Sequence, residues 1–584
     1  MNLVPPGTAT EPLIAYFSME VALESTIPTY SGGLGVLAGD TLRSAADLSL
    51  PVIGVTLVHR KGYFVQVLDA QGWQSEQPAE WAPEKHLEEV GRTCQLTIGG
   101  RTVSVRAWRY RIKGVTGHTV DVLLLDTDLP QNHPDDRRFT DYLYGGDAHY
   151  RLCQELVLGV GGVRMLRALG YRRIGRYHMN EGHSALLALD LFADEMDKVP
   201  DDAERAAEEV RRLCVFTTHT PVSAGHDEFP ADLVHNVLTP TQQENLARVQ
   251  LPSKDLNMTQ LALHLSGFVN GVTKRHAALS RQMFPGFPFQ SITNGVHSGT
   301  WTAPSFQKIF DEHMPDWRGD NLGLRHAFNI PCEQIWEAHV TEKRRLLETV
   351  HELTGEAFDV DAFTMGFARR ATGYKRLDLL LRDPQRLRRL GALWGKIQII
   401  YAGKAHPRDQ EGKELIHHIV NAQNELGPDL RIVYLPNYDM ALAQRLTAGV
   451  DLWMNTPKPP LEASGTSGMK AAHNGVPSLS VLDGWWLEGH VEAVTGWAIG
   501  QRDHGTVPDR GDDADANDLY RALEESILPL YYDEPERWRE LMRFVIGLNA
   551  SYFNTQRMVQ EYVVAAYREA LLPSAEAVET EPAT

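Results

Sequence analysis

Short β-prone runs of apolar residues alternate along this chain with longer amphipathic segments of helical length. The runs are rich in Val, Ile and Leu, and they lie at residues 52–58, 120–125, 215–218, 397–401, 431–435 and 478–482. A strand followed by a helix and another strand is the repeating unit of a parallel sheet with crossover helices. The pattern therefore predicts an α/β fold.

One amphipathic segment, residues 150–169, shows the helical period clearly. Leu152, Leu156, Val160 and Val163 recur at a spacing that places them on one face of a helix. Such an apolar stripe predicts packing against the core.

The periodicity also suggests where the chain divides. The Pro-containing stretch 299–304 interrupts it just after Asn294-Gly-Val-His297, so we expect Rossmann-like domains at 1–297 and 298–550. Asn554 is placed to cap a final helix within 551–572. The tail 573–584 has few apolar residues and is expected to be disordered. The acidic stretch 502–517 predicts an exposed loop.

Composition bounds the class of protein. Of 584 residues, 43% are hydrophobic and 23% charged, which is typical of a globular chain with a sizeable core. The sequence has no run of 18 apolar residues and no visible secretory signal, and its four scattered cysteines predict reduced thiols without a metal site. A net charge of −19 argues against nucleic acid or an anionic membrane as partner. We expect a cytoplasmic protein.

A glycine-rich and hydroxyl-rich stretch, Glu462-Ala-Ser-Gly-Thr-Ser-Gly-Met-Lys470, ends in a single lysine. Glycines let the backbone approach a phosphate closely, and the amides at a helix start favour negative charge. A lysine at that point is placed to pair with a phosphate or to form a Schiff base with an aldehyde. The alternative is a strand-to-helix turn with an ordinary surface lysine.

A basic stretch, Gly366-Phe-Ala-Arg-Arg-Ala-Thr-Gly-Tyr-Lys-Arg376, directly follows a β-prone run. Open α/β sheets bind ligands at the carboxyl ends of their strands, and arginine suits bidentate recognition of phosphate. Because the chain as a whole is acidic, the stretch indicates an anion site. The alternative is a solvated charged turn.

These two stretches together resemble the α-glucan phosphorylases, the glycogen, starch and maltodextrin phosphorylases, and above all their short prokaryotic branch. Further stretches match this family in the same order along the chain: Tyr30-Ser-Gly-Gly-Leu-Gly35, Met179-Asn-Glu-Gly-His183, Thr217-Thr-His-Thr-Pro-Val222, Thr293-Asn-Gly-Val-His297 with Trp301, and Leu435-Pro-Asn-Tyr-Asp439. The resemblance implies two Rossmann-like domains facing a central cleft, the GT-B type glycosyltransferase architecture. It also implies that the last helix crosses back to the first domain.

The resemblance implies a catalytic role for several residues of the second domain. Lys470 matches the lysine that carries pyridoxal 5′-phosphate as a Schiff base, and Arg370 and Lys375 match the pair that binds the substrate phosphate. Tyr374 lies between them. Arg369 stands where the best-known members have a lysine near the cofactor phosphate, and it keeps the charge with a different geometry.

Other positions match contacts of the cofactor and of the sugar. Those assigned to the cofactor are Gly33 of the glycine-rich loop, which in this family lies over the cofactor phosphate and the sugar, the aromatic residues Tyr438 and Trp301, and Thr466. Those assigned to the substrate are Gly32 and Leu34 of the same loop, Asn294, Ala463, Ser464, Gly465 and Glu462. The resemblance also implies a catalytic role for Glu462 and for His219, the latter through its backbone carbonyl beside the glucosyl unit. Glu181 and His183 match substrate contacts as well, although His183 is equally well explained as a satisfied histidine that caps the following helix.

The activity implied is reversible phosphorolysis of an α-1,4-glucan or maltooligosaccharide by inorganic phosphate, which gives α-D-glucose 1-phosphate with retention. The family commonly dimerises, so a homodimer is expected. Two alternatives stay open: a nucleotide-sugar glycosyltransferase of the glycogen-synthase type, and an inactive glucan-binding homologue. Tyr30 in place of a lysine at the first loop, and the presence of Lys470, argue against the synthase.

Overall fold

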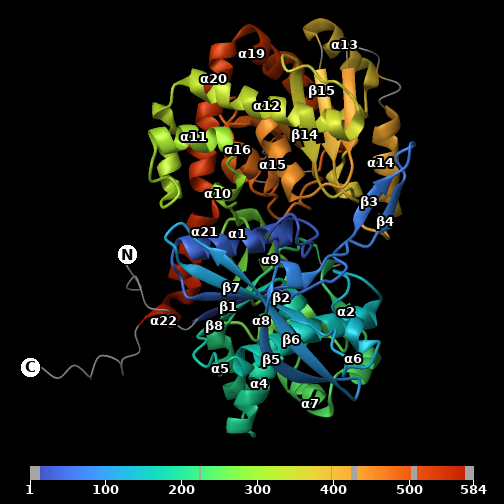
Figure 1. The fold of residues 1–584 in the computed structure, drawn as a ribbon, viewed down its shortest axis with the longest axis vertical. Coiled ribbons are helices and arrows are strands. Elements are labelled where there is room, and N and C mark those ends of the chain that lie inside the picture. The colour runs from blue at the N-terminus through green and yellow to red at the C-terminus, as the bar shows by residue number, and fades with distance from the viewer. Residues whose placement is uncertain are drawn as a thin grey trace, which may run out of the picture.

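The computed structural model describes residues 13–222, 225–395, 397–422, 426, 430–501 and 509–572. The expected tail, 573–584, lies outside the described residues. We call residues 13–297 the first half and residues 298–550 the second half; each is built around one large sheet (Figure 1).

The sheet of the first half is parallel at its centre and antiparallel at one edge. Its described strands, in spatial order, are β13 (Gln290–Ser291), β12 (Phe268–Gly271), β9 (Cys214–Thr217), β8 (Arg176–Asn180), β1 (Ile14–Ser18), β2 (Val52–Leu57), β7 (Thr119–Asp126), β6 (Arg101–Lys113) and β5 (Glu88–Ile98). The antiparallel edge is a hairpin whose turn, Gly99 and Gly100, has positive φ at both residues. A Gly-Gly pair is a strong hairpin signal, so this edge was predictable from the sequence.

The sheet of the second half is parallel throughout. Its described strands are, in spatial order, β16 (Leu430–Leu435), β15 (Ile397–Ala402), β14 (Phe363–Ala368), β17 (Leu452–Asn455), β18 (Ser478–Val481) and β19 (Gly496–Ile499). Together with the first sheet it confirms the predicted α/β class. Two short antiparallel pairs lie apart from the large sheets: β3 (Val65–Leu68) with β4 (Gln74–Gln77), and β10 (Glu228–Phe229) with β11 (Leu256–Asn257).

Helices connect and cover the strands of both sheets. Those of the first half are α1 (Gly33–Asp47), α2 (Ala148–Leu156), α3 (Gly162–Ala168), α4 (Leu186–Lys198), α5 (Ala203–Leu213), α6 (Ala231–Val237), α7 (Pro240–Val249), α8 (Met258–His264) and α9 (Lys274–Met283). Those that follow are α10 (Ser298–Trp301), α11 (Pro304–His313), α12 (Cys332–Thr354), α13 (Pro384–Trp394), α14 (Gln410–Ala422), α15 (Met440–Gly449), α16 (Ser467–Ala472), α17 (Trp486–Gly489), α18 (Asp512–Ala522), α19 (Leu528–Asp533), α20 (Pro535–Phe544), α21 (Thr555–Tyr562) and α22 (Arg568–Leu571). In the described part of the chain, none of these helices has the length and apolar character needed to cross a bilayer.

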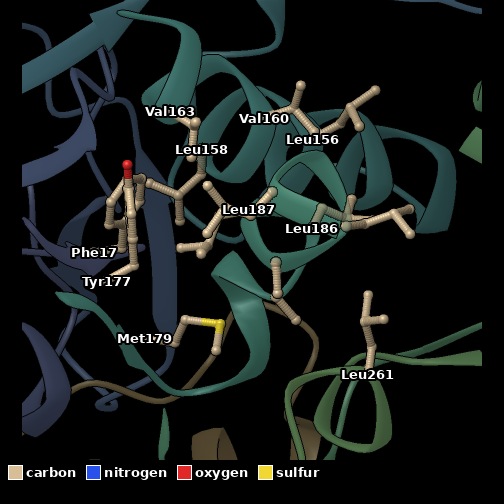
Figure 2. Packing of buried hydrophobic residues seen from close by; sticks show 14 of the residues in the cluster. Phe17, Leu156, Leu158, Val160, Val163, Tyr177, Met179, Leu186, Leu187 and Leu261 are labelled. Atoms are coloured by element: carbon tan, nitrogen blue, oxygen red, sulfur yellow. The ribbon is translucent and has the colours of Figure 1, made fainter. Parts of the chain in front are cut away.

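The helix predicted at 150–169 is α2 and α3, joined without a break by a π-helical turn at Val157–Gly161. The apolar stripe on it is buried, which confirms its role in the core. Figure 2 shows Leu156, Val160 and Val163 on this helix above the side chains of α4. Gly162 is required here, because a Cβ atom would lie 2.4 Å from the ring of Phe17 on β1.

The final helices pack on the first half. Asn554 caps α21, since its Oδ1 accepts a hydrogen bond from the amide of Arg557 (2.9 Å). Thr555 N donates to Val296 O (2.9 Å), and the next residues pack beside α1 in a core cluster with β1. In Figure 1 this red segment runs from the second half down to the first.

The loop expected at 502–517 is wrong from Asp512 onward, where α18 begins; residues 502–508 lie outside the described residues. Asp512, Asp513 and Asp515 in the first turn stabilise the positive end of the helix dipole, and Leu519 and Tyr520 further along the helix are buried. The acidic residues from Asp512 onward, which predicted a loop, therefore form the first turn of a helix.

Candidate active site

The site residues predicted from the sequence follow the carboxyl ends of parallel strands. In the first half, Glu181 follows β8, His219 follows β9 and Asn294 follows β13. In the second half, Arg369 follows β14, and the stretch 462–470 lies between β17 and β18. Parallel strands end at one edge of their sheet, where open α/β sheets bind ligands. Each half therefore gathers its predicted residues at one edge.

The two edges contact each other. Tyr30 Oη accepts a hydrogen bond from Met440 N (2.8 Å), and Thr273 Oγ1 donates to Ala463 O (2.7 Å). Trp301 Nε1 donates to Asp40 Oδ2 on α1 (2.7 Å). One apolar cluster contains residues of both halves, among them Val36, Trp301, Met469 and, at its margin, Tyr438. The structure thus brings the glycine-rich loop, the aromatic pair and the lysine loop together.

Lys470 is buried on α16, and its Nζ lies 4.0 Å from the centre of the Trp301 ring. Within the described residues it makes no ion pair. Burial lowers the pKa of Lys470 to about 8, against the opposing effect of the Asp40 carboxylate. Roughly a tenth of this amine is then neutral at pH 7, far more than for a solvated lysine. A desolvated amine of this kind is a nucleophile suited to Schiff-base formation.

The loop that carries Lys470 depends on two glycines. Gly465 has φ of +70°, a conformation that favours glycine. Gly468 packs against Trp485, where a Cβ would lie 2.7 Å from the ring. Thr466 is the N-cap of α16, yet its side chain makes no capping hydrogen bond. The hydroxyl of Thr466 is thus not used to cap the helix.

Glu462 holds two of the predicted cations. Its Oε2 pairs with Arg369 Nη2 at 2.6 Å and with Lys375 Nζ in still closer contact. Burial disfavours ionisation of Glu462, but the guanidinium and the ammonium outweigh it and lower the pKa to about 2. The backbone amide of Glu462 donates to Asp483 Oδ2 (2.9 Å), and burial raises the pKa of Asp483 to about 7.

Other groups of the basic stretch are not engaged by Glu462. Arg370 is exposed. Arg369 Nη1 is buried and has no hydrogen-bond partner in the described part of the protein. Tyr374 lies beneath Lys375, whose Nζ is 4.5 Å from the ring centre. The stretch therefore offers an exposed guanidinium and a buried, unpaired N–H to an incoming anion.

The glycine-rich loop leads into the N-terminus of α1, a helix of 15 residues with no side-chain cap. A Cβ atom at Gly32 or Gly33 would meet nothing within 4 Å. Packing within the protein therefore does not require glycine at these two positions. Because glycine has no side chain, an anion can approach the amides at the start of α1. Leu34, the next residue, is half-buried. The Glu20 carboxylate shapes the loop by accepting hydrogen bonds from Ser31 N (2.5 Å) and Gly32 N (3.2 Å).

Glu181 and His219 form one network in the first half. The Glu181 carboxylate accepts hydrogen bonds from His219 N (2.7 Å) and Thr220 Oγ1 (3.0 Å). His219 Nε2 lies 2.7 Å from Asn180 Oδ1, and burial lowers the pKa of His219 to about 3. The imidazole of His219 is therefore neutral, and its Nε2 is engaged by Asn180.

His183 does not cap the following helix, so that alternative is wrong. Ala185 precedes α4 without a side-chain bond, and the short turn Gly182–Ser184 is capped by Glu181 instead. His183 Nε2 lies 3.3 Å from Asp227 Oδ2, while Nδ1 is buried without a partner among the described residues. Asn294 Oδ1 is another buried acceptor without a partner there.

Two residues at the site escaped the sequence interpretation. Glu20 lies two residues beyond β1, at the carboxyl end of that strand, but no strand was predicted at residues 14–18. Asp40 carries no such signal, because it lies within α1 and meets Trp301 only after the halves have packed.

A family model described as carbohydrate phosphorylase matches residues 21–134 and 239–496. The maltodextrin phosphorylase of Thermococcus litoralis is 38% identical over 96% of this chain and 71% of its own length. The glycogen phosphorylase of Aquifex aeolicus is 35% identical over 96% of this chain and 86% of its own. An uncharacterised protein of Methanocaldococcus jannaschii is 31% identical over 95% of this chain and 99% of its own. This chain belongs to the carbohydrate phosphorylase family.

Proposed function

We propose that the protein is an α-1,4-glucan phosphorylase. It cleaves the terminal glucosyl unit at the non-reducing end of an α-glucan or maltooligosaccharide with inorganic phosphate and releases α-D-glucose 1-phosphate with retention. The observation that carries the proposal is the buried Lys470 amine, which makes no ion pair among the described residues, on the same loop as Glu462, whose carboxylate holds the cations Arg369 and Lys375. The names of the relatives from Thermococcus litoralis and Aquifex aeolicus, a maltodextrin and a glycogen phosphorylase, agree with it.

The residues present fit pyridoxal 5′-phosphate, the cofactor on which this family generally depends. Lys470 supplies the amine, Trp301 and Tyr438 supply aromatic walls, and the uncapped start of α1 at Gly33 suits an anion. Arg369 and Thr466 offer an N–H and a hydroxyl to the same anion. When bound, the cofactor supplies a phosphate group that exchanges a proton with the substrate phosphate.

The cations of the basic stretch reduce the repulsion between the cofactor phosphate and the substrate phosphate. Two unit negative charges 4 Å apart repel by about 4 kcal/mol at an effective dielectric constant of about 20. Arg370, Lys375 and Arg369 offset this repulsion, and Arg370 and Lys375 orient the substrate phosphate toward the anomeric carbon. Arginine is suited to this task because its planar fork binds two phosphate oxygens at once.

The other wall of the cleft binds the sugar. Glu462 uses Oε2 for its two ion pairs, while Oε1 makes no hydrogen bond with the described residues and is available to a sugar hydroxyl. Ala463, Ser464 and Gly465 continue this wall. Across the cleft, Asn294 offers an unpaired amide oxygen, and the backbone at His219 lies beside the positive charge that develops on the glucosyl unit.

We also propose the division into domains 1–297 and 298–550, with 551–572 as a helix that crosses back. The assignment of each described strand of a large sheet to one side of residue 298 supports this division.

The test combines mapping with an assay. The purified protein, supplied with pyridoxal 5′-phosphate, is reduced with borohydride, and its peptides are mapped by mass; we expect the adduct on Lys470. The same preparation should release glucose 1-phosphate from maltodextrin only when inorganic phosphate is present. An unmodified Lys470 together with glucosyl transfer from a nucleotide sugar would overturn the proposal.

A further inference from the structure

A hairpin of the first half reaches across to the second half. Strands β3 and β4 project from the body of the first half and lie beside α14 in Figure 1. At its tip, Trp73 stacks on His417 with ring centres 4.2 Å apart, and Gln71 O accepts a hydrogen bond from His417 Nδ1 (2.7 Å). Glu76 pairs with Lys413 (2.7 Å). The hairpin is therefore docked on the second half along its length.

Two glutamines of the hairpin, Gln66 toward its base and Gln74 next to its tip, are buried, although glutamine is mostly exposed in proteins: Gln66 is 3% exposed and Gln74 is 7% exposed. Gln66 Nε2 donates to Gln74 Oε1 and to Gly403 O, both at 2.9 Å. Gln74 bonds both backbone groups of one residue, because Ala405 N donates to its Oε1 and its Nε2 donates to Ala405 O, both at 2.9 Å. The pair thus completes the hydrogen bonding of the backbone just beyond β15.

The backbone segment held in this way supports the basic stretch. Arg369 N donates to Ala402 O (3.2 Å), and Ala371 N donates to Lys404 O (3.0 Å). Gly403 packs so closely that a Cβ would lie 1.8 Å from Arg369 O. Any shift of residues 402–405 is therefore transmitted to the start of the stretch that carries Arg369 and Arg370.

Gln66 also holds the segment that carries Tyr438. Its Oε1 accepts a hydrogen bond from Asn437 N (2.8 Å), and its own backbone amide donates to Asn437 Oδ1 (3.3 Å). One hairpin of the first half thus fixes two neighbouring strand ends of the second half. The end of β16 bears Tyr438, which is assigned to the cofactor, and the end of β15 supports Arg369 and Arg370, which follow β14.

We infer that Gln66 and Gln74 are positioning residues for phosphate use, through which the first half sets the geometry of the basic stretch. The inference rests on the proposed function. It predicts that these glutamines affect the substrate phosphate more than the glucan, since their backbone partners support the cations rather than the sugar wall. Neither glutamine is among the residues assigned to the substrate or the cofactor.

The test compares Gln74→Leu and Gln66→Leu with Trp73→Ala, a control at the tip of the same hairpin whose side chain is 38% exposed. In the holoenzyme, each glutamine variant should raise the KM for inorganic phosphate about tenfold or more and change the KM for maltodextrin less than about twofold, because buried backbone groups lose their partners. Trp73→Ala should change both less than about twofold.

Hydrogen exchange supplies a readout independent of activity. In the glutamine variants, amides of residues 367–376 and 399–406 should exchange about tenfold faster than in the wild type, and in Trp73→Ala they should not. Should Gln74→Leu fail to fold, Gln66→Leu carries the test, because it leaves both bonds to Ala405 in place.

The outcomes separate the two proposals. A wild-type protein without phosphate-dependent activity contradicts the proposed function. An active wild type whose glutamine variants keep the phosphate KM and the exchange rates contradicts this inference alone. Equal rises of the glucan and phosphate KM values, or an equal effect of Trp73→Ala, would also overturn it, because the amides would then serve only general stability.

Discussion

Lys470 and Lys375 lie in the same half and are almost equally buried, at 6% and 7% exposure, yet their ammonium groups have different surroundings. Lys375 pairs with the Glu462 carboxylate and lies over Tyr374. Lys470 lies over Trp301 and has no ion pair among the described residues. The carboxylate partner holds the Lys375 ammonium in place, whereas Lys470, without such a partner, has a pKa lowered to about 8. The partner, rather than burial, decides the role.

The largest effect is expected from Lys470→Ala. The variant should lose the borohydride-fixed adduct and about 10⁴-fold or more of the phosphorolysis rate, because covalent attachment of the cofactor is gone. Lys470→Arg, which keeps a positive charge but forms no Schiff base, should lose as much. Substantial activity in the arginine variant would mean that charge alone matters at this position. Mass spectrometry and initial rates measure the two quantities.

Glu462→Gln should have the next largest effect. It leaves two buried cations without their carboxylate, which costs about 3–5 kcal/mol of unfolding free energy, and it removes a sugar contact, so kcat/KM for maltodextrin should fall about 100-fold. Glu524→Gln is a matched control, because its partner Arg386 lies in a more exposed pair and the loss should stay below about 1 kcal/mol. Equal losses in urea denaturation would contradict the role of burial.

The ion pairs of Glu462 with Arg369 and Lys375 predict that the stability of the protein depends on pH. Because the folded-state pKa of Glu462 is lowered to about 2 from an ordinary value near 4.5, its contribution is present above about pH 4.5 and is lost as the pH falls toward 2. The difference in unfolding free energy between the wild type and Glu462→Gln should shrink over that interval. A difference that stays constant would show that the carboxylate is not what the cations require.

Arg370→Ala tests a cation of the other kind, exposed rather than paired. It should raise the KM for phosphate about tenfold, through loss of a charge-assisted contact, and leave the thermal midpoint within about 2 °C. Arg376→Ala is the contrasting variant, because Arg376 is buried and pairs with Asp515 (2.8 Å); it should chiefly lower stability. An unchanged phosphate KM in Arg370→Ala would identify the exposed part of the stretch as a solvated turn.

The smallest effect concerns the amine of Lys470 itself. In protein stripped of cofactor, the rate of reattachment should rise with pH and level off above about pH 8, because only the neutral amine attacks an aldehyde. Asp40→Asn removes a carboxylate that favours the ammonium, so the midpoint should move to lower pH by less than about one unit. A shift to higher pH would contradict the assigned environment.

Features that depend on residues close together in the sequence could be predicted, and contacts between distant residues could not. Strands that are runs of Val, Ile and Leu, such as β2 and β15, were predicted from the local sequence, and Arg369 was found because it directly follows a β-prone run. Strand β8, Arg-Tyr-His-Met-Asn, has no such run, so Glu181 at its end was found only through the resemblance to the family. The helix at Asp512 was missed because its apolar residues, Leu519 and Tyr520, come late in an acidic segment. The pairing of Glu462 with Lys375 and the contact of Asp40 with Trp301 join residues 87 and 261 positions apart, and no local pattern encodes them.

The return of α21 to the first half has a consequence for how the protein is made. The core that contains Ile14 and Tyr16 is completed by Met558 and Tyr562. About 260 residues separate the end of the first half from Met558, so at roughly 5–20 residues per second the ribosome holds this core open for about 13–52 s. During that time the nascent chain displays apolar surface that only its own last helix covers, and it is then that we expect it to need a chaperone.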